Sequence, residues 1–198
     1  MTLLLEHLKQ KYPVDPEKIY ASGFSMGGCK SWDLMQEYPL LFAGLAPMDA
    51  TFDVGLNAFG QPAPRAINMD QPVPVFYAGG EITPLPELPF QAPKCYDRIK
   101  WLLEVNDTEK RYEVSFEEHE QWAEPVWGIT GDQILRFHDD SRDSVLTVHE
   151  FRSRDGRILT QLASISGQGH ECRHHTCEYA WRFISRFRRK ADGTLVSE

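Results

Sequence analysis

The stretch Lys18-Ile-Tyr-Ala-Ser-Gly-Phe-Ser-Met-Gly-Gly28 decides the fold of this 198-residue chain. Residues 18–23 form a short segment of mostly apolar and small residues, which is typical of a strand buried on both faces of a parallel sheet. A glycine-rich turn over residues 23–28 follows directly. A helix is predicted over residues 26–38, because Pro39 then ends it. The sequence therefore predicts a buried strand, a sharp turn and a helix in immediate succession.

Two further segments continue the alternation of strand and helix. Residues 42–48 and 73–78 are predicted to be buried strands, joined over residues 50–71 by a loop rich in proline, glycine and asparagine. Residues 94–106 are predicted to form a helix with one apolar side. Because strand–helix–strand units are right-handed and bury parallel strands between helices, the predicted fold class is α/β. We expect a mostly parallel sheet in a three-layer sandwich.

The second half of the chain predicts antiparallel strands. Residues 145–151 and 158–165 alternate between apolar and polar side chains, and Asp155-Gly156 between them is a strong signal for a β-hairpin. A last helix is predicted over residues 174–189, with Phe187 among its inward side chains, and a loose tail over residues 190–198.

The whole chain, residues 1–198, is expected to form a single domain. Residues 2–12 are predicted to be an amphipathic helix. Residues 107–157 are interpreted as an irregular insertion that contributes one strand of the hairpin, with short strands and turns over residues 107–140.

Composition and charge exclude several classes of function. The net charge of −8 at pH 7 argues against a nucleic-acid partner, which requires a basic face, and against an anionic membrane surface. The longest apolar runs are far shorter than the ~20 residues that span a bilayer. The first residues are too charged and too few for a signal peptide. We therefore expect no membrane association and a cytoplasmic location.

Ser25 is the candidate nucleophile. It is the central residue of Gly23-Phe-Ser-Met-Gly27, a G-x-S-x-G pattern that arises by chance in roughly one chain in fifteen of this length. The predicted strand before it and helix after it make the pattern more specific. On such a bend the serine oxygen is exposed, and the backbone N–H of Met26 points at the oxyanion that forms in acyl transfer. A nucleotide-binding turn is the alternative, but G-x-G-x-x-G and a P-loop lysine are both absent from the sequence.

His170 is the candidate general base, since histidine is the usual partner of a serine nucleophile. It ends the segment Ser166-Gly-Gln-Gly-His170, after a predicted strand and before the last helix, so a compact glycine loop can deliver its ring to the ends of the strands. The other histidines lie in the predicted helices or in the irregular half of the chain: His7, His119, His138, His149, His174 and His175.

A carboxylate is expected to orient the imidazole. In folds with this serine bend the chain order is serine, acid, histidine. The acid usually follows the second strand after the serine bend. In this chain that strand is the one over residues 73–78, which comes after the strand that ends near residue 48. Glu81 is therefore the predicted acid, with Glu87 as the next candidate and Asp139 or Asp140 after it.

The four cysteines, Cys29, Cys95, Cys172 and Cys177, are too few for a disulfide scaffold. Cys172 and Cys177, with His170 and His175, suggest a zinc site, but their spacing matches no standard pattern and a second cysteine pair is lacking. We expect no metal; a link between Cys172 and Cys177, or packing at the start of the helix, is the simpler interpretation.

Four segments together resemble the polyhydroxybutyrate depolymerase and feruloyl esterase group of the α/β-hydrolase superfamily. They are residues 15–28 around the serine, Phe42-Ala-Gly-Leu-Ala-Pro-Met48, Pro74-Val-Phe-Tyr-Ala-Gly-Gly-Glu81 and Ser166-Gly-Gln-Gly-His170. The resemblance covers most of residues 10–90 and 158–189. It implies Ser25 as nucleophile, Met26 as an oxyanion N–H donor, Glu81 as acid and His170 as base. It further implies activity on carboxylic esters of short hydroxyacid polymers or plant-wall carbohydrates, with no cofactor.

The chain departs from this group in two ways. The acid position holds Glu81 where the group has aspartate. The nucleophile strand is usually the fifth of the sheet, whereas only 17 residues precede Lys18. We expect that the earlier strands and the second oxyanion donor are missing, which costs about 10²–10³ in rate and leaves a free sheet edge. Either a missing N-terminal segment or a second copy of the chain is expected to cover that edge. The alternative function is a non-catalytic hydrolase-like binding module.

Overall fold

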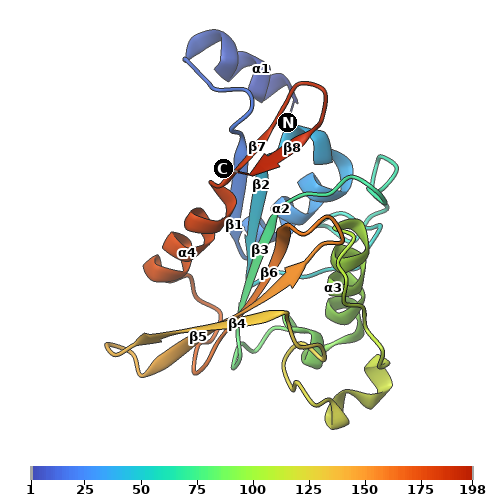
Figure 1. Ribbon diagram of the computed structural model, residues 1–198, viewed down its shortest axis with the longest axis vertical. Coiled ribbons are helices and arrows are strands. Elements are labelled where there is room, and N and C mark those ends of the chain that lie inside the picture. Colours follow the sequence, from blue (N-terminus) through green and yellow to red (C-terminus); the bar gives the residue numbers. More distant parts are fainter. Residues whose placement is uncertain (1, 198) are drawn as a thin grey trace.

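A six-stranded mixed sheet forms the centre of the protein in a computed structural model that describes residues 2–197 (Figure 1). The strand order is β1-β2-β3-β6-β5-β4. Strands β1, β2, β3 and β6 are mutually parallel, whereas β5 is antiparallel to both β6 and β4. The strands are β1 Tyr20–Phe24, β2 Gly44–Met48, β3 Val75–Gly80, β4 Gln133–Asp139, β5 Ser144–Arg152 and β6 Ile158–Ile165.

Helices cover both faces of this sheet, which confirms the predicted α/β class. α2 and α3 lie on one face and α4 on the other (Figure 1). α1 extends away from the sheet at the end where β1 begins. The α-helices are α1 Thr2–Lys11, α2 Met26–Glu37, α3 Pro93–Val105 and α4 His174–Ile184, and the short 3₁₀ helices are Pro39–Leu41, Pro89–Gln91 and Phe116–Gln121.

The core consists of two layers because neighbouring residues of a strand face opposite sides of the sheet. Leu45, Tyr77 and Leu162 are fully buried against α2 and α3. Ala46 and Phe76 are fully buried on the other side, against α4. These strands are apolar on both faces, as the sequence predicted for the centre of a parallel sheet.

A fully buried arginine ties the long loop over residues 50–71 to the core. The Arg98 guanidinium lies over the rings of Trp32, Phe52 and Trp101, at 4.6 to 5.3 Å from their centroids. It donates to Gln36 Oε1 at 3.0 Å and to the carbonyl of Phe52 at 3.1 Å. Burial lowers the pKa of Arg98 to about 9. The hydrogen bonds compensate the cost of placing this cation inside the protein.

The predicted hairpin is confirmed: β5 and β6 pair antiparallel, and Gly156 in their connection has φ 89°. The end of the chain differs from the prediction. α4 stops at Ile184, and Phe187–Arg189 forms β7, which pairs with β8, Leu195–Ser197, in a separate two-stranded hairpin. The prediction of a helix to residue 189 followed by a loose tail was therefore wrong. Phe187 has the spacing of the apolar residues on the helix face before it, but it is buried as part of a strand.

Side-chain hydrogen bonds explain why β7 is ordered. Arg189 is buried and donates to the carbonyls of Phe42 at 2.7 Å and Gly193 at 3.0 Å. Gly193 adopts φ 87°, which allows the chain to turn between the two strands. The tail is therefore anchored to the start of β2.

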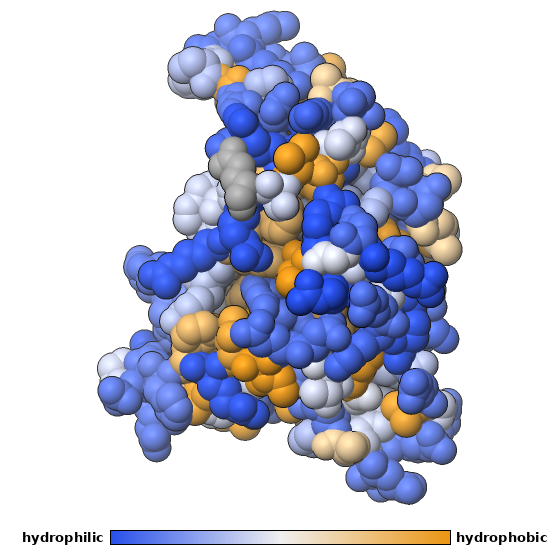
Figure 2. Space-filling view, viewed as in Figure 1, coloured by the Kyte–Doolittle hydropathy of each residue, from blue (hydrophilic) through white to orange (hydrophobic). Residues whose placement is uncertain are grey.

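The surface in Figure 2 is mostly hydrophilic, with apolar side chains in separate small groups. Among the helices that the structure describes, none is both long and apolar enough to cross a bilayer.

Candidate active site

Ser25 occupies the bend between β1 and α2. Its backbone has φ 55° and ψ −121°, a conformation that costs free energy for a residue with a Cβ atom. Two hydrogen bonds hold the bend: the N–H of Ser25 donates to the carbonyl of Met48 at 3.0 Å, and the N–H of Cys29 donates to the carbonyl of Ser25 at 2.9 Å. The strain is thus maintained by the adjacent strand and by the first helical turn.

Two glycines make the bend sterically possible. A Cβ atom on Gly23 would lie 2.2 Å from the carbonyl carbon of Gly27, and one on Gly28 would lie 2.6 Å from the carbonyl oxygen of Met48. Both distances are far below van der Waals contact. A Cβ atom on Gly27 would meet nothing within 4 Å. Gly23 and Gly28 are therefore needed for the close packing of helix on strand, and Gly27 is not.

The structure brings Ser25 and His170 together across 145 residues of sequence. The Nε2 atom of His170 lies 2.9 Å from the Oγ atom of Ser25. The imidazole also packs on Phe24, with ring centroids 4.6 Å apart. In this position the ring can accept the hydroxyl proton, which is the arrangement that activates a serine.

A short loop after β6 carries the imidazole to this position. Gly167 has φ 65°, so the chain turns sharply after the strand. The loop rests on the end of β3, because a Cβ atom on Gly80 would lie 2.4 Å from the carbonyl oxygen of Gln168 and 2.5 Å from that of Gly169. The N–H of Ile82 donates to the same Gln168 carbonyl at 3.0 Å.

Met26, the predicted oxyanion donor, is the first residue of α2. Backbone N–H groups in the first turn of a helix have no acceptor within the helix, and the helix dipole favours negative charge there. The Met26 side chain is 53% exposed, so solvent and ligands can reach this end of the helix.

The predicted acid, Glu81, has a different partner. Its Oε1 atom accepts a hydrogen bond from the hydroxyl of Ser164 at 2.7 Å. Among residues 2–197, no hydrogen bond or ion pair joins Glu81 to His170. In the described residues the Glu81 carboxylate is therefore paired with Ser164 and not hydrogen-bonded to the imidazole.

Among the described residues, the other carboxylates considered for this role also form no hydrogen bond or ion pair with the imidazole. Asp139, at the end of β4, bonds Ser141 and lies 3.5 Å from His175, and Asp140 is exposed. Glu87 is buried, and its Oε2 atom has no hydrogen-bond partner among the described residues. Burial and the nearby charge of Asp49 raise the pKa of Glu87 to about 7.

Asp49 is a buried carboxylate near this site that the sequence reasoning did not consider. It directly follows β2, is 2% exposed and has φ 44°. Its Oδ1 atom accepts the N–H of Gly80 at 2.8 Å. Burial raises the pKa of Asp49, whereas the Gly80 N–H and the charge of His170 lower it. The sequence did hold a signal for it: Asp49 is a carboxylate directly after the predicted strand that ends at Met48. We had looked for the acid after the next strand, which ends at Ala78 in the prediction.

His149, Cys172 and Cys177 form no hydrogen bond with Ser25 or His170 among the described residues. His149 is 3% exposed, 3.9 Å from Glu124, and burial lowers its pKa to about 4. Cys172 and Cys177 are exposed, with their Sγ atoms 3.5 Å apart. Within residues 2–197, no cluster of three or more histidine, cysteine, aspartate or glutamate side chains has the arrangement of a metal site.

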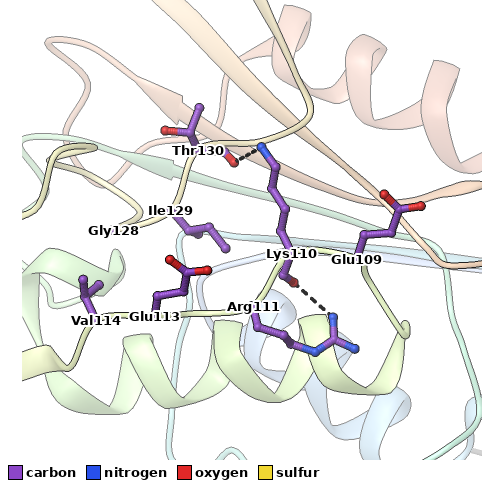
Figure 3. A pocket seen from close by; sticks show the side chains of 8 residues that line it. All are labelled: Glu109, Lys110, Arg111, Glu113, Val114, Gly128, Ile129 and Thr130. Atoms are coloured by element: carbon purple, nitrogen blue, oxygen red, sulfur yellow. Dashed lines mark hydrogen bonds between the residues drawn. The ribbon is translucent and has the colours of Figure 1, made fainter.

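One hollow of about 470 Å³ does not include the Ser25–His170 pair (Figure 3). It lies between residues 109–114 and residues 128–130. Lys110 points across it and donates to the carbonyls of Thr130 and Gly131, both at 2.8 Å. Because Lys110 is already hydrogen-bonded to the backbone of the facing loop, we interpret this hollow as the contact between two loops.

Comparison with known proteins gives a distant, partial similarity. No known family model matches the chain. A stretch of 77 residues is 32% identical to a bifunctional acetylxylan esterase/xylanase of Neocallimastix patriciarum. The match covers 39% of this chain and 10% of that protein. The similarity agrees with the hydrolase-like arrangement of the sheet.

Proposed function

We propose that this chain is a serine esterase of the α/β-hydrolase type, with Ser25 as nucleophile and His170 as general base. The observation that supports this most strongly is the 2.9 Å approach of His170 Nε2 to Ser25 Oγ on a strained bend. A strained serine beside an imidazole at a helix N-terminus has a direct use in acyl transfer. The distant similarity to a protein with acetylxylan esterase activity points to the same class.

The reaction proceeds through an acyl-enzyme. The hydroxyl proton of Ser25 passes to His170 Nε2 while Oγ forms a bond to the ester carbonyl carbon. The N–H of Met26 stabilises the oxyanion. The bond to the leaving alcohol then breaks, and His170 gives its proton to the alcohol oxygen. Water enters, loses a proton to His170 and attacks the acyl carbon. The bond from Ser25 Oγ to the acyl carbon then breaks, and His170 returns the proton to Oγ, so that the acid is released and Ser25 is restored.

The substrates proposed are esters of hydroxyacid polymers or plant-wall carbohydrates. The support is the resemblance of residues 15–28 and 166–170 to polyhydroxybutyrate depolymerases and feruloyl esterases, together with the acetylxylan esterase in the relative's name. Hydrolysis of acetylated xylan, methyl ferulate and hydroxybutyrate oligomers by the purified chain distinguishes these possibilities.

We further propose that the edge of β1 is covered in the active form, by an N-terminal segment or a second copy. β1 lies at one edge of the sheet. A partly apolar groove runs beside it, bounded by α1 and α4 and lined by Leu5, Leu8, Ile19, Ala21, Trp181 and Ile184. A covering strand could supply the second oxyanion donor. If the edge stays open, the alternative, a non-catalytic binding module, predicts no turnover of p-nitrophenyl acetate even at high protein concentration.

A fluorophosphonate probe tests the proposed function. It should label the chain on Ser25, and both Ser25→Ala and His170→Gln should lose the label. Ser141→Ala is the matched control, because Ser141 is exposed in the turn between β4 and β5 and should leave labelling unchanged. Equal labelling of the wild-type and Ser25→Ala chains would overturn the proposal.

A further inference from the structure

The imidazole of His170 lacks a partner on its far side. Its Nδ1 atom is buried and has no hydrogen-bond partner among the described residues. Leaving a buried polar atom unpaired costs free energy, because the atom loses its hydrogen bonds to water and gains none in the protein. Which nitrogen carries the proton is decided by the hydrogen bond that the other one makes. Since Nε2 must accept the Ser25 proton, Nδ1 must carry its own proton and needs an acceptor.

Asp49 lies in the row of residues that ends the parallel strands. In the register of the sheet Phe24 pairs with Met48, and Met48 pairs with Ala78, so Asp49 comes between Ser25 on one strand and Gly79 on the other. Its N–H donates to the carbonyl of Ala78 at 2.8 Å. The positive φ of Asp49 ends the strand there and redirects the chain.

The Asp49 carboxylate reaches the part of the sheet on which the His170 loop rests. Its Oδ1 atom is 2.8 Å from the N atom of Gly80. The carbonyls of Gln168 and Gly169 press on this same glycine. Absence of a side chain at Gly80 therefore allows the loop that carries His170 to lie directly against the residue that holds Asp49.

The charges around Asp49 come from that loop as well. Burial is the largest influence on the pKa of Asp49 and raises it. Four groups act in the opposite direction and lower this pKa: the N–H of Gly80, the charge of His170, the N–H of Glu171 and the side chain of Gln168. Three of these four groups belong to residues 168–171. The Asp49 carboxylate thus faces the segment that contains the imidazole, whereas the Glu81 carboxylate bonds Ser164 on β6.

The geometry points to Asp49, rather than Glu81, as the positioning residue of this site. Its carboxylate accepts the Nδ1–H of His170 when the site is engaged, which fixes the proton on Nδ1 and leaves Nε2 free for Ser25. This inference rests on the proposed esterase function. It moves the acid from the strand after β2 to the end of β2 itself.

Three variants of the full chain test this inference by hydrolysis of p-nitrophenyl acetate. Asp49→Asn should lower kcat by about 10³–10⁴ with little change in KM, because an amide stabilises the wrong tautomer. Asp49→Glu, which keeps a carboxylate, should lower kcat less than Asp49→Asn does. The kcat of Glu81→Gln should stay within about threefold of the wild-type value. Thermal melts verify that each variant is folded.

The outcomes separate this inference from the proposed function. If Ser25→Ala keeps full turnover, the esterase proposal itself fails. If Ser25→Ala is inactive while Asp49→Asn keeps its kcat and Glu81→Gln loses it, only the assignment of Asp49 is overturned.

A measurement on the wild-type protein does not depend on how the variants fold. ¹⁵N NMR of the imidazole, assigned by comparison with His170→Gln, reports which nitrogen carries the proton. The inference expects the proton of neutral His170 on Nδ1, and a proton on Nε2 would contradict it.

Discussion

Replacing the buried Glu87 by glutamine should stabilise the protein at high pH and not at low pH. Burial and the charge of Asp49 raise the pKa of Glu87 from 4.5 to about 7. Between these two values the folded state keeps a proton that the unfolded state releases, so wild-type stability falls as the pH rises. At 1.36 kcal/mol for each pKa unit, the cost above pH 7 is about 3 kcal/mol. The variant lacks this cost because its amide does not ionise.

Urea unfolding of both proteins at pH 4, 5.5, 7 and 8 measures this effect. The difference in the free energy of unfolding, variant minus wild type, should grow by about 3 kcal/mol from pH 4 to pH 8. Taking the difference removes the contribution of all other groups that titrate in this range. Glu118→Gln is the matched control, because Glu118 is exposed and its difference should stay flat. A difference for Glu87→Gln that does not change with pH would refute the reasoning.

Three other predictions use matched or direct measurements. Gly23→Ala should lose roughly 3 kcal/mol or more in urea unfolding, since its Cβ atom would overlap the Gly27 carbonyl carbon, whereas Gly27→Ala should change stability by about 1 kcal/mol or less; equal losses would contradict this. Gly80→Ala should lower kcat/KM for p-nitrophenyl acetate about 100-fold by displacing the carbonyl of Gly169, and Gly169→Ala, whose Cβ atom meets nothing within 4 Å, should stay within about threefold. In an NMR titration His149 should titrate near pH 4, because burial favours its neutral form. The stability that this neutral side chain contributes is fully present above pH 6.5 and is lost as the pH falls toward 4. Titration near 6.5 would contradict its burial.

The order of strands and helices in the first half could be predicted because local sequence specifies it. The segments around Leu45, Tyr77 and Leu102 are apolar with strand or helix periodicity, and prolines and glycines mark their ends. The proximity of Ser25 to His170 could be predicted for a similar reason. Both residues follow parallel strands, whose carboxyl ends meet at one edge of the sheet.

The acid that we propose for the imidazole could not be predicted in the same way. Asp49 and Glu81 each follow a parallel strand, so both belong to the correct edge of the sheet. Their difference depends on side-chain partners: Ser164 takes Glu81, while Asp49 bonds Gly80 beneath the histidine loop. Such contacts join residues that are far apart in sequence and follow no periodicity.

The end of the last helix was misread because one pattern matches two structures. Phe183 and Phe187 are spaced for one helix face, and both are buried, yet the chain leaves the helix after Ile184. The buried bonds of Arg189 to backbone carbonyls stabilise β7, and a long polar side chain at that position reads as helix surface in the sequence.

The central claim is that Ser25 and His170 act together on an acyl carbon at the start of α2. A crystal structure of the protein reacted with an alkyl phosphonate that imitates the tetrahedral intermediate tests it most directly. We predict phosphorus bonded to Ser25 Oγ, one phosphonyl oxygen within hydrogen-bond distance of the Met26 N atom, and His170 Nε2 facing the leaving-group position. Phosphorus on another residue, or on Ser25 with His170 turned away from it, would contradict the account.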